Sequence, residues 1–93
     1  MRFEWDSAKA ELNAAKHGVT FSEATETFAD PFALTRSDPR HSTVEARFVT
    51  MGRTTRDVIV VVAHTDRVES IRIISARKAA PSERKEYERR RDR

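Results

Sequence analysis

Six consecutive apolar residues, Val58 to Ala63, constrain the fold of this chain more than any other feature. The run is far shorter than the roughly 20 residues of a membrane span, and it shows no polar alternation. It therefore predicts a central β-strand, residues 57–64, whose two faces are both covered. The segments 44–51 and 67–76 alternate apolar and polar residues, which is typical of neighbouring strands with one buried face. We predict turns at 52–56 and 65–66.

The first third of the chain has helical spacing instead. Asp6 is a suitable N-cap for a helix that runs to about His17, where Gly18 supplies the left-handed residue that ends it. Spacing predicts that one face packs inward and that a neighbouring stripe is cationic. The inward set is Ala8, Leu12 and Ala15; the stripe is Lys9, Asn13 and Lys16.

A second helix is predicted from a cap at Ser22 to Phe28, before Asp30-Pro31 stops it. Two further segments are predicted: residues 2–5 as an edge strand or an extended lead-in, and residues 32–36 as an additional edge strand. The polar segment 37–43 is predicted to be a mobile loop. A C-terminal helix is predicted from about Ser82 to Arg91, with Pro81 in its first turn and Tyr87 as its only large apolar anchor.

These elements make one α+β domain, residues 1–93, because a chain of 93 residues has length for one thin core. The expected architecture is two N-terminal helices, a three- to four-stranded antiparallel sheet and a C-terminal helix. The chain has no cysteine, so a disulfide framework is excluded. The charged start of the sequence and the absence of a long apolar run lead us to expect a cytoplasmic protein without membrane contact.

Charge is concentrated in two segments. Residues 36–56 hold five arginines against two acidic residues, and residues 67–78 hold four cations against Glu69 alone. A positive field on the middle and last strands favours a polyanionic partner, nucleic acid above all.

Two motifs have residue types suited to proton transfer at a phosphate. His17 follows Lys16 at the end of the first helix, although a histidine there also serves as an ordinary C-terminal cap. Glu45 and Arg47 share one face of a strand, where a carboxylate base beside a guanidinium suits phosphoryl chemistry. The alternative for this pair is a surface ion pair of under about 1 kcal/mol.

Arg77 and Lys78 precede the predicted C-terminal helix, so they are candidates for binding an anion at its N-terminus. Strict alternation places Arg72 with Ile74 and Ala76, and Arg77 on the opposite face with Ile71 and Ile73. His41 and His64 have no neighbours at metal-ligand spacing, so we expect no metal and no cofactor. Trp5 is interpreted as a core residue and Tyr87 as a helix anchor.

Taken together, these motifs resemble the BrnT family of toxins from bacterial type II toxin–antitoxin systems. The resemblance covers almost the whole chain. The matching residues are Glu4-Trp5-Asp6, Lys9, Asn13, Lys16-His17-Gly18-Val19, Phe21, Glu23-Ala24, Phe28, Asp30-Pro31, Glu45, Arg47, Gly52, Val60 to Val62, Arg72 to Arg77, Glu83-Arg84 and Tyr87.

The resemblance implies a RelE-like domain that acts as a metal-independent ribonuclease and inhibits translation. It implies a BrnA-like ribbon-helix-helix antitoxin, with operator DNA bound only through that antitoxin, and a dimer within the complex. For such a reaction we assign proton transfer and charge stabilisation to His17, Glu45, Arg47 and Arg77. We assign substrate binding to Lys9, Lys16, Arg72, Lys78 and Tyr87.

Two other functions fit the same basic strip. One is a non-catalytic module that binds nucleic acid or the ribosome, and the other is a corepressor that bridges antitoxins. Salt weakens every such interaction, so affinity alone does not separate these functions from cleavage. RNA cleavage in the presence of EDTA does.

Overall fold

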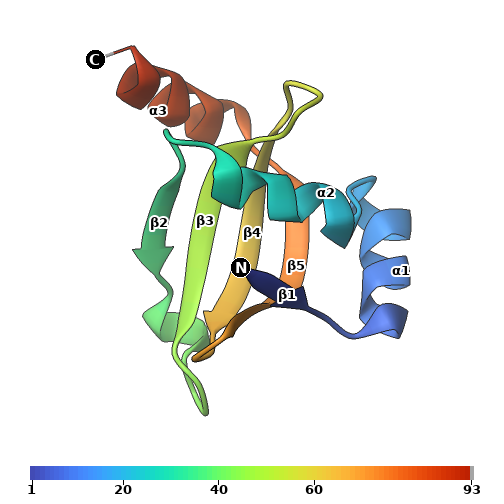
Figure 1. Ribbon diagram of the computed structural model, residues 1–93. Coiled ribbons are helices and arrows are strands. Elements are labelled where there is room, and N and C mark those ends of the chain that lie inside the picture. Colours follow the sequence, from blue (N-terminus) through green and yellow to red (C-terminus); the bar gives the residue numbers. More distant parts are fainter. Residues whose placement is uncertain (93) are drawn as a thin grey trace.

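The computed structural model describes residues 1–92 and has three α-helices on a five-stranded sheet. Figure 1 shows their arrangement. In chain order the elements are β1 (Arg2–Glu4), α1 (Ser7–His17), α2 (Phe21–Thr25), the 3-10 helix η1 (Glu26–Ala29), β2 (Leu34–Ser37), the 3-10 helix η2 (Pro39–His41), β3 (Arg47–Arg53), β4 (Ile59–Asp66), β5 (Ser70–Lys78) and α3 (Pro81–Arg91). The α+β class is as predicted.

The strand order is β1-β5-β4-β3-β2, and β4 is central as its apolar sequence predicts. The prediction of a three- to four-stranded antiparallel sheet is wrong in one respect. β1 pairs in parallel with β5, Arg2 opposite Ser70, so the sheet is mixed and has five strands. Residue alternation predicts a strand but does not identify its partner, and this partner lies far along the chain. A close RelE-like arrangement stays a prediction.

Helix α1 has the predicted ends. The Asp6 carboxylate accepts the N–H of Lys9 at 3.0 Å, and Gly18 adopts φ 70° and donates to the carbonyl of Ala14. The predicted faces are wrong, however: Leu12 is 71% exposed and Asn13 only 8%. The helix lies at the edge of the sheet, beside β5 rather than across it (Figure 1). Polar contacts with that edge therefore decide which face turns inward.

Asn13 is the residue that makes these contacts. Its side-chain amide donates to the carbonyls of Ala76, at 2.8 Å, and Val19, at 3.1 Å, and its oxygen accepts the Ala76 N–H at 3.1 Å. β1 pairs with β5 only from Ser70 to Arg72. Farther along β5, the Asn13 amide occupies the position that a neighbouring peptide group would have in a longer β1.

The second helix begins at Thr20, not at Ser22 as predicted. The Thr20 hydroxyl accepts the Glu23 N–H while the Glu23 carboxylate accepts the Thr20 N–H, which is a capping box. The helix keeps α geometry only to Thr25 and continues as η1, so the single helix predicted to Phe28 is two short pieces.

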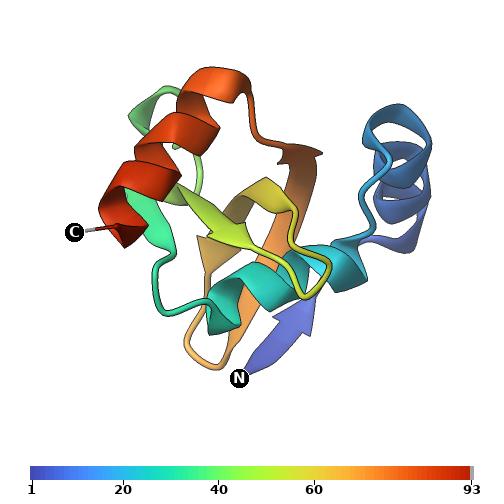
Figure 2. The same ribbon diagram turned by 90° about the horizontal axis from the view of Figure 1, so that it is seen from above.

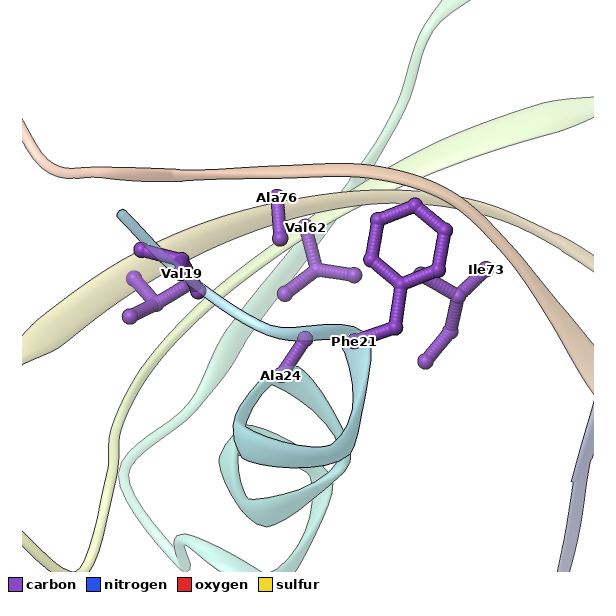
Figure 3. Packing of buried hydrophobic residues seen from close by; sticks show 7 residues of the cluster. Val19, Phe21, Ala24, Val62, Ile73 and Ala76 are labelled. Carbon is purple, nitrogen blue, oxygen red and sulfur yellow. The ribbon is translucent and has the colours of Figure 1, made fainter. Parts of the chain in front are cut away.

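The first core lies between α2 and one face of the sheet. Figure 3 shows Val19, Phe21 and Ala24 against Val62, Ile73 and Ala76 of β4 and β5, all of them buried. Trp5 packs edge-on against Phe21, with ring centroids 6.0 Å apart, as expected of a core residue.

The second core lies on the opposite face, under α3, and Figure 2 shows α2 and α3 on the two sides of the sheet. Tyr87 is 1% exposed and packs with Met51, Ile59 and Val61. Its hydroxyl donates to the carboxylate of Asp30 at 2.5 Å. Tyr87 is therefore the predicted anchor of α3, which begins at Pro81 rather than Ser82.

Strands β3 to β5 lie a few residues later than predicted. Gly52 is in β3 rather than in a turn. A residue without a side chain is needed there because η1 crosses closely above it: a Cβ would lie 2.9 Å from the carbonyl oxygen of Thr27. The hairpin turn follows at residues 54–58, where Asp57 has φ 66°. The segment predicted to be a mobile loop contains η2.

A β-bulge in β5 changes the predicted faces of its arginines. Ser75 pairs with Ala63 and Ile73 with His64, so Ile74 is an extra residue. Beyond it Ala76 lies with Ile73 in the first core, and Arg77 lies on the α3 face, the same face as Arg72. Strict alternation had separated the two arginines. No helix within residues 1–92 is long and apolar enough to cross a membrane.

Candidate functional site

A hollow of about 180 Å³ lies on the α3 face of the sheet, beyond the part that α3 covers. Three regions of the chain form it: the start of α1, the segment before β3, and the adjoining ends of β3, β4 and β5. Its lining residues are Asp6, Lys9, His41, Thr43, Val44, Glu45, Arg47, Thr65, Arg72, Ile73 and Ile74.

The floor of the hollow includes a row of three side chains across the sheet. Arg47 of β3 is opposite Thr65 of β4, and Thr65 is opposite Arg72 of β5. Directly paired residues extend their side chains from the same face, with Cβ atoms about 4.5–5.5 Å apart. Two arginine side chains therefore flank the side chain of Thr65 on one face of the sheet. In the described residues Arg47 forms no ion pair within 4.0 Å, and the nearest for Arg72 is Glu4 at 4.0 Å.

The start of α1 adds a third cation. Lys9 lines the hollow, while Asp6 is occupied as the helix cap. The backbone N–H of Lys9 is the main cause that lowers the pKa of Asp6 below its ordinary value. Asp6 is therefore ionised at neutral pH, and its carboxylate is held as the helix cap.

Glu45 is the carboxylate of the rim. Arg67 holds it from outside, with its Nη2 atom 3.3 Å from Glu45 Oε1 and its Nη1 atom 3.3 Å from Glu4 Oε1. This arginine ties the segment before β3 to β1 and to the β4–β5 turn. A carboxylate that lines the same hollow as three cations is suited to accept a proton from a hydroxyl group next to a bound phosphate.

His41 is a rim residue to which the sequence assigned no role, because it was considered only as a metal ligand and no metal site was expected. Its Nδ1 atom lies 2.9 Å from Asp38 Oδ2, because the η2 turn brings residues i and i+3 together. The side chain is 63% exposed, which leaves the other ring nitrogen available. An imidazole oriented by a carboxylate is suited to proton transfer. The sequence signal was Asp-Pro-Arg-His, with proline at the first position of the turn.

The hollow contains four of the nine residues that the sequence assigned to a site: Lys9, Glu45, Arg47 and Arg72. The other five, Lys16, His17, Arg77, Lys78 and Tyr87, do not line it. The structure brings the first turn of α1 to the arginines, not the lysine-histidine end that the sequence favoured.

Lys16 and His17 lie in the last turn of α1, and the other three residues outside the hollow have a structural role or lie in another depression. Arg77 makes a bidentate pair with Glu83, at 2.7 and 3.0 Å, and this hydrogen bonding raises the pKa of Arg77 and lowers that of Glu83. Tyr87 is the buried anchor of α3, where burial and the hydrogen bond to Asp30 raise its pKa. Lys78 lies in a separate depression below α3.

The remaining histidine, His64, is buried on the α2 face. Its ring nitrogens lie 2.7 Å from Thr50 Oγ1 and from Asp66 Oδ1, and two phenylalanine rings flank it. Within residues 1–92 no three histidine or acidic side chains form a group that could hold a metal ion.

Two comparisons with known proteins point to the same family. The family model described as the ribonuclease toxin BrnT of type II toxin–antitoxin systems matches residues 5–83. A crystal structure of the Brucella abortus ribonuclease toxin BrnT matches with a TM-score of 0.63 and 24% identity, over 86% of this chain and 97% of that one. A comparison with curated proteins found no match.

Proposed function

The chain belongs to the BrnT family of ribonuclease toxins of type II toxin–antitoxin systems, and from this premise we propose that it cleaves RNA in the hollow without a metal ion. The observation that carries the proposal is the set of groups around the hollow. Three cations, the Glu45 carboxylate and an imidazole all line one space of about 180 Å³, together with Asp6, which serves as the cap of α1. They are the groups that phosphodiester transesterification needs.

Glu45 is proposed as the general base. Its carboxylate takes the proton of a ribose 2′-hydroxyl, and the oxygen then attacks the adjacent phosphorus. Charge grows on the phosphorane oxygens, where Arg47, Arg72 and Lys9 stabilise it. These cations supply the electrostatic stabilisation for which other nucleases use a metal.

His41 is proposed as the general acid. As the bond from phosphorus to the 5′-oxygen breaks, the protonated imidazole donates its proton to that oxygen, and Asp38 keeps the ring oriented. The products are a 2′,3′-cyclic phosphate and a 5′-hydroxyl end. Water is not consumed in this step.

The test is cleavage of a labelled RNA by the purified protein in EDTA, with analysis of the product ends. We expect cyclic phosphate ends, and a loss of about 10²- to 10⁴-fold in rate for Glu45→Gln and for His41→Ala. Glu11→Gln, an exposed glutamate on α1, is the matched control and retains the parent rate. Intact RNA at every protein concentration would contradict the proposal and favour the non-catalytic binding module.

The two histidine assignments are separated by a second pair of variants. If His17→Ala abolished cleavage while His41→Ala did not, the proton transfer would belong to the end of α1, as the sequence alone suggested. We expect the reverse, because His41 lines the hollow and His17 does not.

A toxin of a type II system implies an antitoxin partner. We propose a BrnA-like ribbon-helix-helix protein that covers the toxin, carries operator DNA binding for the pair and joins toxin dimers within the complex, in the cytoplasm. Co-expression with the protein of the neighbouring reading frame is expected to restore growth and to yield a co-purified complex that shifts operator DNA. Operator binding by the toxin alone would contradict this assignment.

A further inference from the structure

We infer that Thr65 is a substrate-binding residue, whose hydroxyl binds a phosphate oxygen held between Arg47 and Arg72. This inference rests on the proposed RNA substrate and adds to it a specific contact. Thr65 lies in the segment where the sequence predicted a turn, and it had no role in the expected site.

The first observation is an orphaned polar atom. Thr65 is 3% exposed, and its hydroxyl oxygen has no hydrogen-bond partner. A buried hydroxyl without a partner costs stability, since it has given up water and gained nothing in return. The five other buried polar or charged residues have no such unpaired side-chain atom. Within residues 1–92, the only other buried side-chain atoms without a hydrogen-bond partner belong to Glu4 and Arg53.

The second observation is where this hydroxyl lies. Thr65 lines the hollow, and it is the middle member of the row formed with Arg47 and Arg72. The two flanking strands are about 9–10 Å apart, twice the spacing of neighbouring strands. Arginine side chains extend far enough to contact one anion from both sides of that gap. An oxygen of this anion then lies above the middle strand, where Thr65 is.

The third observation is the charge balance of the row. Arg47 has no carboxylate within ion-pair distance in the described part of the chain, and Arg72 has only Glu4 at 4.0 Å. Arg77, on the same face, instead donates two hydrogen bonds to Glu83. The guanidinium groups beside Thr65 are thus the ones left for a ligand. A hydroxyl between two cations donates readily to a phosphate oxygen.

Because the Thr65 hydroxyl has no partner in the fold, its removal is expected to affect stability and RNA binding in opposite ways. Thr65→Val keeps the side-chain shape and removes a hydroxyl that does nothing for the fold, so the urea midpoint stays equal to that of the parent or rises. Binding of RNA falls in the same variant. A residue with a purely structural role would show the opposite pattern. Thr50→Val is the matched comparison, because its buried hydroxyl is bonded to Thr35 and His64 and its loss lowers the midpoint.

The experiment measures binding of a short single-stranded RNA with 2′-O-methyl sugars, which cannot be cleaved by attack of the 2′-oxygen. We expect Thr65→Val to weaken binding about 10-fold or more, the scale of a hydrogen bond to a charged group. Thr65→Ser, which keeps the hydroxyl, stays close to the parent. The slope of log affinity against log salt is unchanged in Thr65→Val, because no charge is lost. In Arg47→Gln that slope falls by about 0.7.

The outcomes separate this inference from the proposed function. If the parent protein leaves unmodified RNA intact but Thr65→Val still weakens binding of the 2′-O-methyl strand, the nuclease proposal fails and the phosphate contact stands. If Thr65→Val binds as tightly as the parent, the inference is overturned, whatever the protein does to unmodified RNA. A lowered urea midpoint with unchanged binding overturns it as well, since the hydroxyl would then serve the fold.

Discussion

Replacing Asn13 with alanine is expected to destabilise the protein more than any other change on α1. The substitution removes the amide that pairs with the free edge of β5, leaving the N–H of Ala76 and the carbonyls of Ala76 and Val19 without this partner. A buried N–H without a partner costs about 1–3 kcal/mol. Carbonyls tolerate this loss better, and we take the total as about 2–4 kcal/mol.

This loss is a large share of the free energy of unfolding, which for a protein of 93 residues is roughly 5–14 kcal/mol. It corresponds to a fall in Tm of about 8–30 °C. Helix propensity does not contribute, because alanine is the better helix former. Urea unfolding followed by far-UV circular dichroism measures the change, and Glu11→Ala, exposed on the same helix, is the control. An unfolding free energy within about 0.5 kcal/mol of the parent would refute the reasoning.

Asn13→Asp sharpens the same prediction. Aspartate keeps the acceptor for the Ala76 N–H but faces two carbonyl oxygens with a carboxylate, so it is expected to be at least as destabilising as alanine at neutral pH. Protonation of the introduced carboxylate at low pH restores one hydrogen-bond donor to these carbonyls. The stability deficit of Asn13→Asp relative to the parent is therefore expected to shrink as the pH falls, whereas that of Asn13→Ala is expected to stay constant.

Three further predictions concern the packing of η1 and α3. Gly52→Ala is expected to lower the unfolding free energy by about 1–3 kcal/mol, because the new Cβ meets the backbone of Thr27; urea unfolding measures it. Tyr87→Phe removes a hydrogen bond to a carboxylate and is expected to cost about 1.5–3 kcal/mol by the same assay, and an unchanged midpoint would contradict the role of the hydroxyl as an anchor. Glu83 has a lowered pKa, mainly through its hydrogen bonds with Arg77, so its contribution to stability is fully present above the ordinary carboxyl pKa of about 4.5 and is lost as the pH falls below it. In a series of unfolding curves against pH, Glu83→Gln is expected to flatten this acid-dependent loss.

Local signals in the sequence predicted most element types and several ends. The Asp6 cap, the Gly18 end and the apolar run of β4 depend on neighbouring residues, so they are readable from the chain alone. The inward face of α1 was not readable, because it depends on an edge of β5 that lacks a partner. An asparagine among lysines looks like part of a polar stripe until that edge is known.

The sequence predicted several residues of the candidate site but not how the fold brings them together. Glu45, Arg47 and Arg72 were recognised from their residue types, and the register of β3 to β5 brings the two arginines into one row. One extra residue in β5 moved Arg77 to the other face, a shift that alternation cannot reveal. Thr65 gave no signal, since an unpaired hydroxyl is a property of its surroundings.

The parallel pairing of β1 with β5 determines when the molecule can be completed during synthesis. Residues 2–4 leave the ribosome early and remain without their partner until residues 70–72 have followed. The floor of the hollow likewise awaits Arg72. Throughout most of its translation the nascent polypeptide consequently lacks a finished hollow, and the groups that we propose to cleave RNA come together only near the end of synthesis.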